Sequence, residues 1–241
     1  MALAFLWGAV GAAALLVGAL VAYAGAPSRR FIAVVMALGA GLLIGSVAFE
    51  LVDEAVKTAS VAQVGLLTLL GAATFTAGDW WLSRRGGGER KDASGAQATG
   101  APLAIVFGSV LDGIPESFVL GLTVLEGNVS VALLAGVILS NFPEGLSSSS
   151  GLRAAGWTRS RVLWMWSAVV LVAAVSAALG YLLLDPAGGD RTGALAQGFA
   201  AGALLAMVSN TLLPESYRVE GVATGSLVAV GFAVSLMLSA I

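Results

Sequence analysis

Two stretches near the middle of the chain, Leu111-Asp112-Gly113-Ile114-Pro115-Glu116 and Leu139-Ser140-Asn141-Phe142-Pro143-Glu144, each place a proline and a carboxylate inside a long apolar segment. An ionisable side chain in hydrocarbon costs on the order of 3 kcal/mol unless it faces a partner or a polar cavity. A proline inside a helix also releases the carbonyl four residues earlier from its hydrogen bond. The two stretches therefore predict negative charge and loose backbone oxygens at membrane depth, a combination suited to binding a cation.

The composition of the whole chain indicates an integral membrane protein. Of the 241 residues, 58% are hydrophobic and 11% are charged, which is far more apolar than a typical soluble domain. The chain has no cysteine and no histidine, so a disulfide framework, a thiolate zinc site and imidazole metal ligands are excluded. The net charge of −2 comes without a basic stripe, and nucleic acid is not an expected partner. The expected surroundings are a lipid bilayer.

Eight apolar runs have the length of about 20 residues that crosses a bilayer as a helix. They lie near 3–24, 31–52, 61–82, 102–125, 129–152, 161–184, 193–214 and 221–241. The polar, glycine-rich segment 83–100 predicts a flexible cytoplasmic loop between the third and fourth runs. The chain 1–241 is therefore expected to be a single all-α membrane domain with eight transmembrane helices.

The positions of Lys and Arg predict the orientation of these helices. If the N-terminus is outside, ten of the twelve basic residues lie in inner loops, and only Lys57 and Arg191 lie in outer loops. Cytoplasmic loops of membrane proteins carry such an excess of basic residues. Because eight spans return the chain to its starting side, both termini are expected outside.

An internal repeat relates the second and seventh runs. Ala40-Gly41-Leu42-Leu43 matches Ala201-Gly202-Ala203-Leu204, and Glu54 matches Glu215, at a constant offset of 161 residues. Because the two runs cross the membrane in opposite directions, the match predicts inverted repeats around the two proline-containing helices, as in many secondary transporters. A chance match between segments rich in Ala, Gly and Leu is the alternative interpretation.

The proline motifs resemble those of the ZIP (Zrt/Irt-like) divalent metal transporters. The segments 112–116 and 140–145 are similar to the two His-Asn-x-Pro-Glu-Gly motifs of that family, and 49–54 and 209–215 resemble its second and seventh helices in bacterial members. This resemblance spans essentially the whole chain. It implies eight helices in a 3-2-3 inverted-repeat bundle with both termini outside. It also implies the inner membrane of a bacterium as the location.

The chain departs from the family at the motif histidines. Asp112 and Ser140 stand where family members usually carry histidine, whereas Glu116 and Glu144 are retained. The resemblance then implies a metal site whose donors are all oxygen atoms, from Asp112, Glu116, Ser140, Asn141 and Glu144. Such donors suit Mn²⁺, Fe²⁺ or Mg²⁺, and carboxylates also bind Zn²⁺. The alternative is that Glu116 and Glu144 are protonated structural residues.

Polar residues at the ends of the second and seventh runs form a second candidate group. Glu50, Asp53 and Glu54 are expected near the outer surface, and Asn210 and Glu215 near the inner surface. They are expected to attract and release cations at the entrance and exit of a path. Alternatively, they are interfacial helix ends that reach water.

Together these features predict a secondary transporter, not an enzyme, that moves a divalent metal cation such as Zn²⁺, Mn²⁺ or Fe²⁺ toward the cytoplasm. The ion is then a substrate and not a resident cofactor. Two alternatives stay open: a membrane scaffold or sensor with a degenerate metal site, and a transporter of a non-metal cation. The sequence is compatible with a homodimer.

Overall fold

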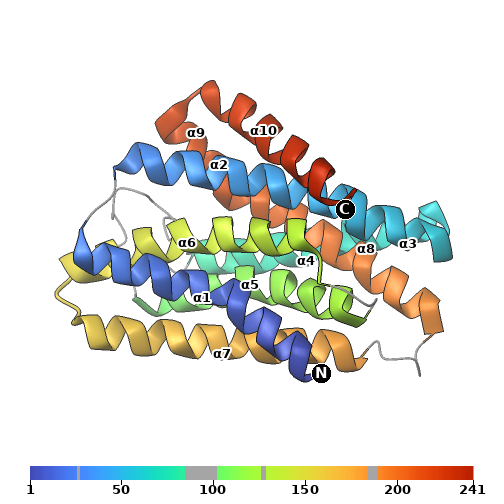
Figure 1. Cartoon of the computed structure of the whole chain (residues 1–241), viewed down its shortest axis with the longest axis horizontal. Coiled ribbons are helices and arrows are strands. Elements are labelled where there is room, and N and C mark those ends of the chain that lie inside the picture. Colours follow the sequence, from blue (N-terminus) through green and yellow to red (C-terminus); the bar gives the residue numbers. More distant parts are fainter. Residues whose placement is uncertain (26–27, 85–101, 126–128, 184–188, 241) are drawn as a thin grey trace.

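The computed structural model describes residues 1–25, 28–84, 102–125, 129–183 and 189–240, and in these ranges its regular secondary structure is helical throughout (Figure 1). The α-helices are α1 (Ala2–Ala24), α2 (Arg29–Ser46), α3 (Asp53–Thr58), α4 (Val61–Leu82), α5 (Pro102–Leu125), α6 (Val131–Ala154), α7 (Arg159–Leu183), α8 (Gly189–Met207), α9 (Leu213–Glu220) and α10 (Ala223–Leu238). Two π-helical turns, Val47–Val52 and Val208–Leu212, join α2 to α3 and α8 to α9. The all-α prediction is confirmed. Most of the predicted loop over 83–100 lies outside the described residues.

Within the described ranges, seven helical segments are long and apolar enough to cross a membrane. They are Ala2–Ala24, Arg29–Thr58, Val61–Leu82, Ile105–Val124, Val131–Ala154, Arg159–Leu182 and Arg191–Glu220. The eighth predicted span, 221–241, corresponds to α10, an apolar helix of 16 residues. These lengths and compositions support an integral membrane protein built from transmembrane helices.

The second and seventh spans are longer than predicted. The helix expected over 31–52 runs from Arg29 to Thr58, and the helix expected over 193–214 runs from Arg191 to Glu220. The π-helical turns allow this continuation because a π turn, with hydrogen bonds between residues five apart, changes the helix geometry locally without ending the helix. Pro214 follows the second π turn at the beginning of α9, where the helix tolerates its missing N–H.

Serine residues mark where three helices begin. Ser28, Ser60 and Ser130 each precede a helix, and each side chain accepts a hydrogen bond from the backbone N–H three residues later. This contact satisfies one of the N–H groups that a helix start leaves without a partner in the helix. The helix beginnings therefore follow from local sequence.

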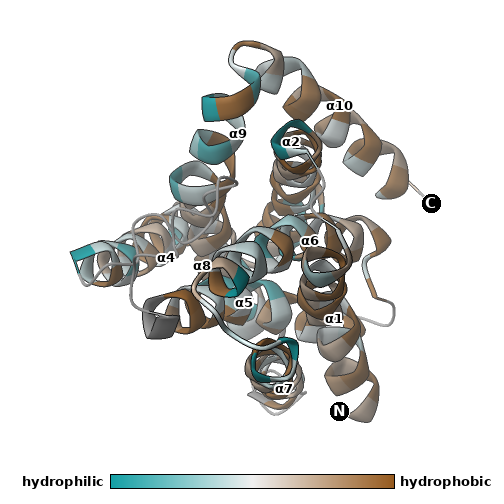
Figure 2. Ribbon diagram, turned by 90° about the vertical axis from the view of Figure 1, so that its left-hand side faces the viewer, coloured by the Kyte–Doolittle hydropathy of each residue, from teal (hydrophilic) through white to brown (hydrophobic). Residues whose placement is uncertain are grey.

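The helices divide into a central set and a peripheral set. More than half of the most apolar window is buried in α5, in α6 and in the long segments α2–α3 and α8–α9, against less than half in α1, α4 and α7. Seen end-on, α6 lies near the middle, and α1, α4, α7 and α10 lie around it (Figure 2). Both proline-containing helices, α5 and α6, therefore belong to the interior of the bundle.

Glycine residues set how closely the helices approach one another. A Cβ atom on Gly41 of α2 would lie 2.1 Å from the carbonyl oxygen of Val228 in α10. A Cβ atom on Gly202 of α8 would lie 1.8 Å from the carbonyl oxygen of Thr68 in α4. At these distances no residue larger than glycine fits without moving the helices apart. Small residues at the contact are the usual way in which membrane helices pack closely. The pairs α2–α10 and α4–α8 therefore contact through backbone.

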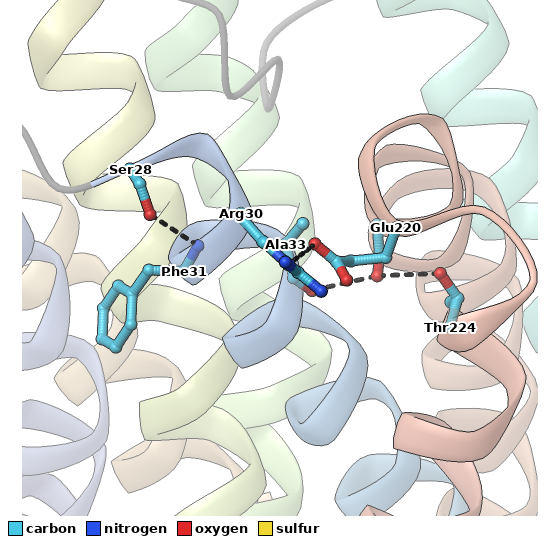
Figure 3. A network of polar contacts seen from close by, with 7 residues as sticks. Ser28, Arg30, Phe31, Ala33, Glu220 and Thr224 are labelled. Carbon is cyan, nitrogen blue, oxygen red and sulfur yellow. Dashed lines mark hydrogen bonds and ion pairs between the residues drawn. The ribbon is translucent and has the colours of Figure 1, made fainter.

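Polar contacts join α9 to the beginning of α2 (Figure 3). The Arg30 Nε atom lies 3.2 Å from Oε1 of Glu220, whose side chain is only 6% exposed. The Ser216 hydroxyl donates to the Ala33 carbonyl at 2.9 Å and lies 3.3 Å from the hydroxyl of Thr224. These contacts hold the end of the long segment Arg191–Glu220 against the beginning of the long segment Arg29–Thr58.

Candidate cation-binding site

All five predicted donor residues are buried in the interior of the bundle. They are Asp112 and Glu116 on α5 and Ser140, Asn141 and Glu144 on α6, and none is more than 5% exposed. Polar side chains are costly in such surroundings and are retained mainly where they have a function or a partner. The five side chains therefore lie inside the bundle and not on its lipid-facing surface.

Each of the two motif glutamates accepts a hydrogen bond from a serine on the other helix. The hydroxyl of Ser140 on α6 donates to Oε1 of Glu116 on α5 at 2.9 Å. The hydroxyl of Ser109 on α5 donates to Oε1 of Glu144 on α6. The structure thus brings Ser140 and Glu116 together, and it adds Ser109, which is 3% exposed.

Asn141 has a different neighbour. Its amide nitrogen donates to the backbone carbonyl of Gly11 in α1, at a nitrogen–oxygen distance of 3.4 Å. Its side chain is therefore drawn toward α1. Asp112, one turn before Glu116, is 1% exposed.

The carbonyl released by Pro143 lies against α2. Pro143 has no N–H to donate to the Leu139 carbonyl four residues earlier, and α6 nevertheless continues through this position. A Cβ atom on Gly39 of α2 would lie 3.1 Å from that oxygen. The Gly39 backbone thus covers the Leu139 carbonyl.

In this conformation the acidic side chains do not gather into a single metal-binding cluster. Among the described residues, no group of three or more His, Cys, Asp or Glu side chains is placed to hold one metal ion. What the structure brings together is two serine–glutamate pairs across α5 and α6.

The two π-helical turns carry one predicted path residue each. Glu50 is half-buried and accepts hydrogen bonds from the hydroxyl groups of Ser130 and Ser239, the latter at 3.2 Å. Asn210 is exposed, and its amide donates to Oδ2 of Asp79 on α4 at 3.2 Å. Each π turn is thereby joined to a neighbouring helix through a polar side chain.

The other three predicted path residues lie beside basic side chains. Lys57 Nζ lies 3.3 Å from Asp53 Oδ2 and 2.7 Å from Glu54 Oε2, on the surface of α3. Glu215 is buried, with Oε2 at 3.3 Å from Arg218 Nη1. Exposed ion pairs contribute little to stability because water and salt screen them. The basic partners reduce the negative charge that these acids present at the two ends.

Sequence reasoning missed Ser109. A signal for it exists, because Ser109, Asp112 and Glu116 recur at intervals of three and four residues and therefore share one face of α5. The motif resemblance begins only at Asp112.

No model of a known protein family matches this chain, and no curated protein matches it. The resemblance to ZIP transporters therefore rests on the motifs quoted above.

Proposed function

We propose that this protein is a secondary transporter of the ZIP type, which moves a divalent metal cation across the membrane toward the cytoplasm. The observation that carries this proposal is the pair of buried glutamates, Glu116 and Glu144, each bonded to a serine of the other proline-containing helix. Two ionised carboxylates supply the charge that balances one divalent cation. Their position in the interior of a bundle of membrane-spanning length is the expected place for a transport site.

The proposed inverted repeats have further support. The π-helical turns begin at Val47 and Val208, at the same offset of 161 residues as the sequence match. Gly41 and Gly202, also matched by that offset, are the glycines of their helices where an added Cβ atom would come nearest to a neighbouring backbone, that of α10 and α4 respectively. We therefore assign α1 to α4 and α7 to α10 to the two repeats of the 3-2-3 arrangement, on either side of α5 and α6.

In this mechanism each glutamate carboxylate would bind the ion in place of the hydrogen bond that it accepts from a serine hydroxyl. Glu116 and Glu144 are the principal ligands, and the hydroxyl groups and Asp112 add further oxygen atoms. Oxygen donors of this kind bind Mg²⁺ and Mn²⁺ well, and carboxylates also accept Zn²⁺. Glu50 and Asn210, on the two π turns, would act where the ion enters and leaves.

The first prediction tests Glu144 directly. Glu144→Gln preserves the size of the side chain and removes its charge, so uptake of Mn²⁺ or Zn²⁺ into reconstituted vesicles should fall to background. The matched control is Glu220→Gln, which removes a carboxylate that is paired with Arg30 and lies outside the candidate site and path, and it should leave uptake near the wild-type rate.

Metal analysis of the purified protein separates the alternatives. A stoichiometric divalent ion supports transport or sensing of metal, and metal-dependent flux into vesicles distinguishes a transporter from a scaffold. Near-normal metal flux through folded Glu144→Gln protein would exclude this site as the path.

A further inference from the structure

We infer that Ser109 is a specificity-determining residue of the transport site, where its hydroxyl oxygen is a ligand of the ion held by Glu144. This inference rests on the proposed function and adds a residue outside the proline motifs. The contact that carries it is the hydrogen bond from Ser109 on α5 to Glu144 on α6.

Ser109 differs from those hydroxyl residues of the bundle that bond within their own helix, whereas Ser130, Ser140 and Ser239 also donate to a carboxylate elsewhere in the bundle. The hydroxyl groups of Thr68, Thr74, Ser150 and Thr211 all donate to the carbonyl four residues earlier in their own helix. That contact is the ordinary way for a helical serine or threonine to satisfy its hydroxyl. Ser109 instead donates to a carboxylate of another helix, although it is 3% exposed.

The contact has a counterpart in which the serine is already a predicted donor. Ser140 on α6 donates to Glu116 on α5, so the two helices exchange one serine–glutamate hydrogen bond in each direction. Ser140 is assigned to the site from its place in the second motif, and its hydroxyl also lies 3.0 Å from the Val137 carbonyl of its own helix. The contact with a glutamate of the other helix is the geometry that Ser109 shares with it.

The spacing of the oxygen atoms suits an ion. In the Ser140–Glu116 pair the two oxygen atoms are 2.9 Å apart. Neighbouring oxygen ligands of an octahedral ion with bonds of about 2.0–2.1 Å are separated by about 2.9 Å. A serine and a glutamate joined in this way can therefore turn from a hydrogen bond to two adjacent positions around one cation with little movement.

A hydroxyl ligand at this position favours hard ions, so replacing it with a thiol should change the order in which the protein prefers different metals. The test is Ser109→Cys in the full-length protein, whose chain has no cysteine of its own. Because thiolate prefers soft ions, competition between Cd²⁺ and Mn²⁺ for vesicle uptake should shift toward Cd²⁺ by about tenfold or more. The matched control is Ser46→Cys, another buried serine with an interhelical hydrogen bond, to Ser235, which should keep the wild-type order.

Two further variants test the hydroxyl itself. Ser109→Ala should weaken Mn²⁺ binding by about 10- to 100-fold or more, because losing an oxygen ligand should cost at least as much as losing a group that only supports a ligand. Ser109→Thr retains the hydroxyl and should restore most of the affinity. If the alanine variant does not fold, the cysteine and threonine variants decide the question.

The outcomes separate this inference from the proposed function. Unchanged metal order in Ser109→Cys, together with unchanged Mn²⁺ affinity in Ser109→Ala, would make Ser109 a packing residue, while loss of uptake in Glu144→Gln would still support transport. Wild-type protein that neither binds nor moves a divalent ion would overturn both.

Discussion

Glu116 and Glu144 show how single residues make a carboxylate tolerable inside an apolar bundle. Each accepts a serine hydroxyl from the neighbouring helix, which replaces part of the hydration lost on burial. A hydroxyl supplies a hydrogen bond without a positive charge. Neither contact therefore adds a positive charge beside the carboxyl group that it reaches, and in the proposed transport site the residues around the two glutamates would determine which cation binds best.

At this scale we expect the missing histidines to control metal preference. Replacing Asp112 and Ser140 together with histidine should shift competition between Zn²⁺ and Mn²⁺ toward Zn²⁺, because imidazole is a softer ligand than carboxylate or hydroxyl oxygen. The measurement is uptake of one metal into vesicles at increasing concentrations of the other. An unchanged order of metals would mean that selectivity is set elsewhere on the path.

At the scale of helices, the two longest segments share an architecture. Each contains a π-helical turn, in Val47–Val52 and Val208–Leu212, and each packs through glycine on one peripheral helix. The π turns carry Glu50, which accepts a hydrogen bond from Ser239 directly after α10, and Asn210, which donates to Asp79 on α4. π-helical turns frequently occur at functional sites. Close glycine contacts position these turns, so the glycines should matter for stability.

Gly202→Ala tests this dependence. The added Cβ would lie 1.8 Å from the Thr68 carbonyl oxygen, so α4 and α8 must separate, at a cost of about 1–3 kcal/mol. Thermal unfolding in detergent should show a lower midpoint. Gly65→Ala on α4 is the control, because its Cβ would meet nothing within 4 Å. Equal midpoints for the two variants would contradict glycine-mediated packing.

At the scale of the whole molecule, the two ends of the bundle differ. The N-terminus and the end of α10 lie toward one end, and the end of α1, the beginning of α2 and the turn from α6 to α7 lie at the other (Figure 1). At that second end arginine packs on aromatic rings: Arg161 lies 3.6 Å from the ring centre of Trp157, and Arg153 lies 5.7 Å from that of Tyr23. Tyr23 also donates to the Trp157 carbonyl. Aromatic and basic residues gathered in this way are typical of a cytoplasmic membrane interface.

Cysteine labelling tests the proposed orientation. Thr58 at the end of α3 and Ser160 at the beginning of α7 are both exposed and lie at opposite ends of the bundle (Figure 1). In intact cells an impermeant thiol reagent should label Thr58→Cys, and it should label Ser160→Cys only after the membrane is permeabilised. The native chain has no cysteine to interfere. The reverse pattern would place the termini in the cytoplasm.

The amino-acid sequence by itself determined the helical class and the approximate spans, because the length of an apolar run is a local property. The cost of a carboxylate in hydrocarbon also predicted that Glu116 and Glu144 would not face lipid, and both are buried. It placed the ends of two helices too early, since the apolar pattern stops near the π-helical turns while the helices continue through them to Thr58 and Glu220. Only the tertiary structure decided that Ser109 meets Glu144 and that Ser140 meets Glu116. Those partners depend on how α5 and α6 are rotated and shifted against each other. The spacing of residues within one helix gives no information about the position of the other helix.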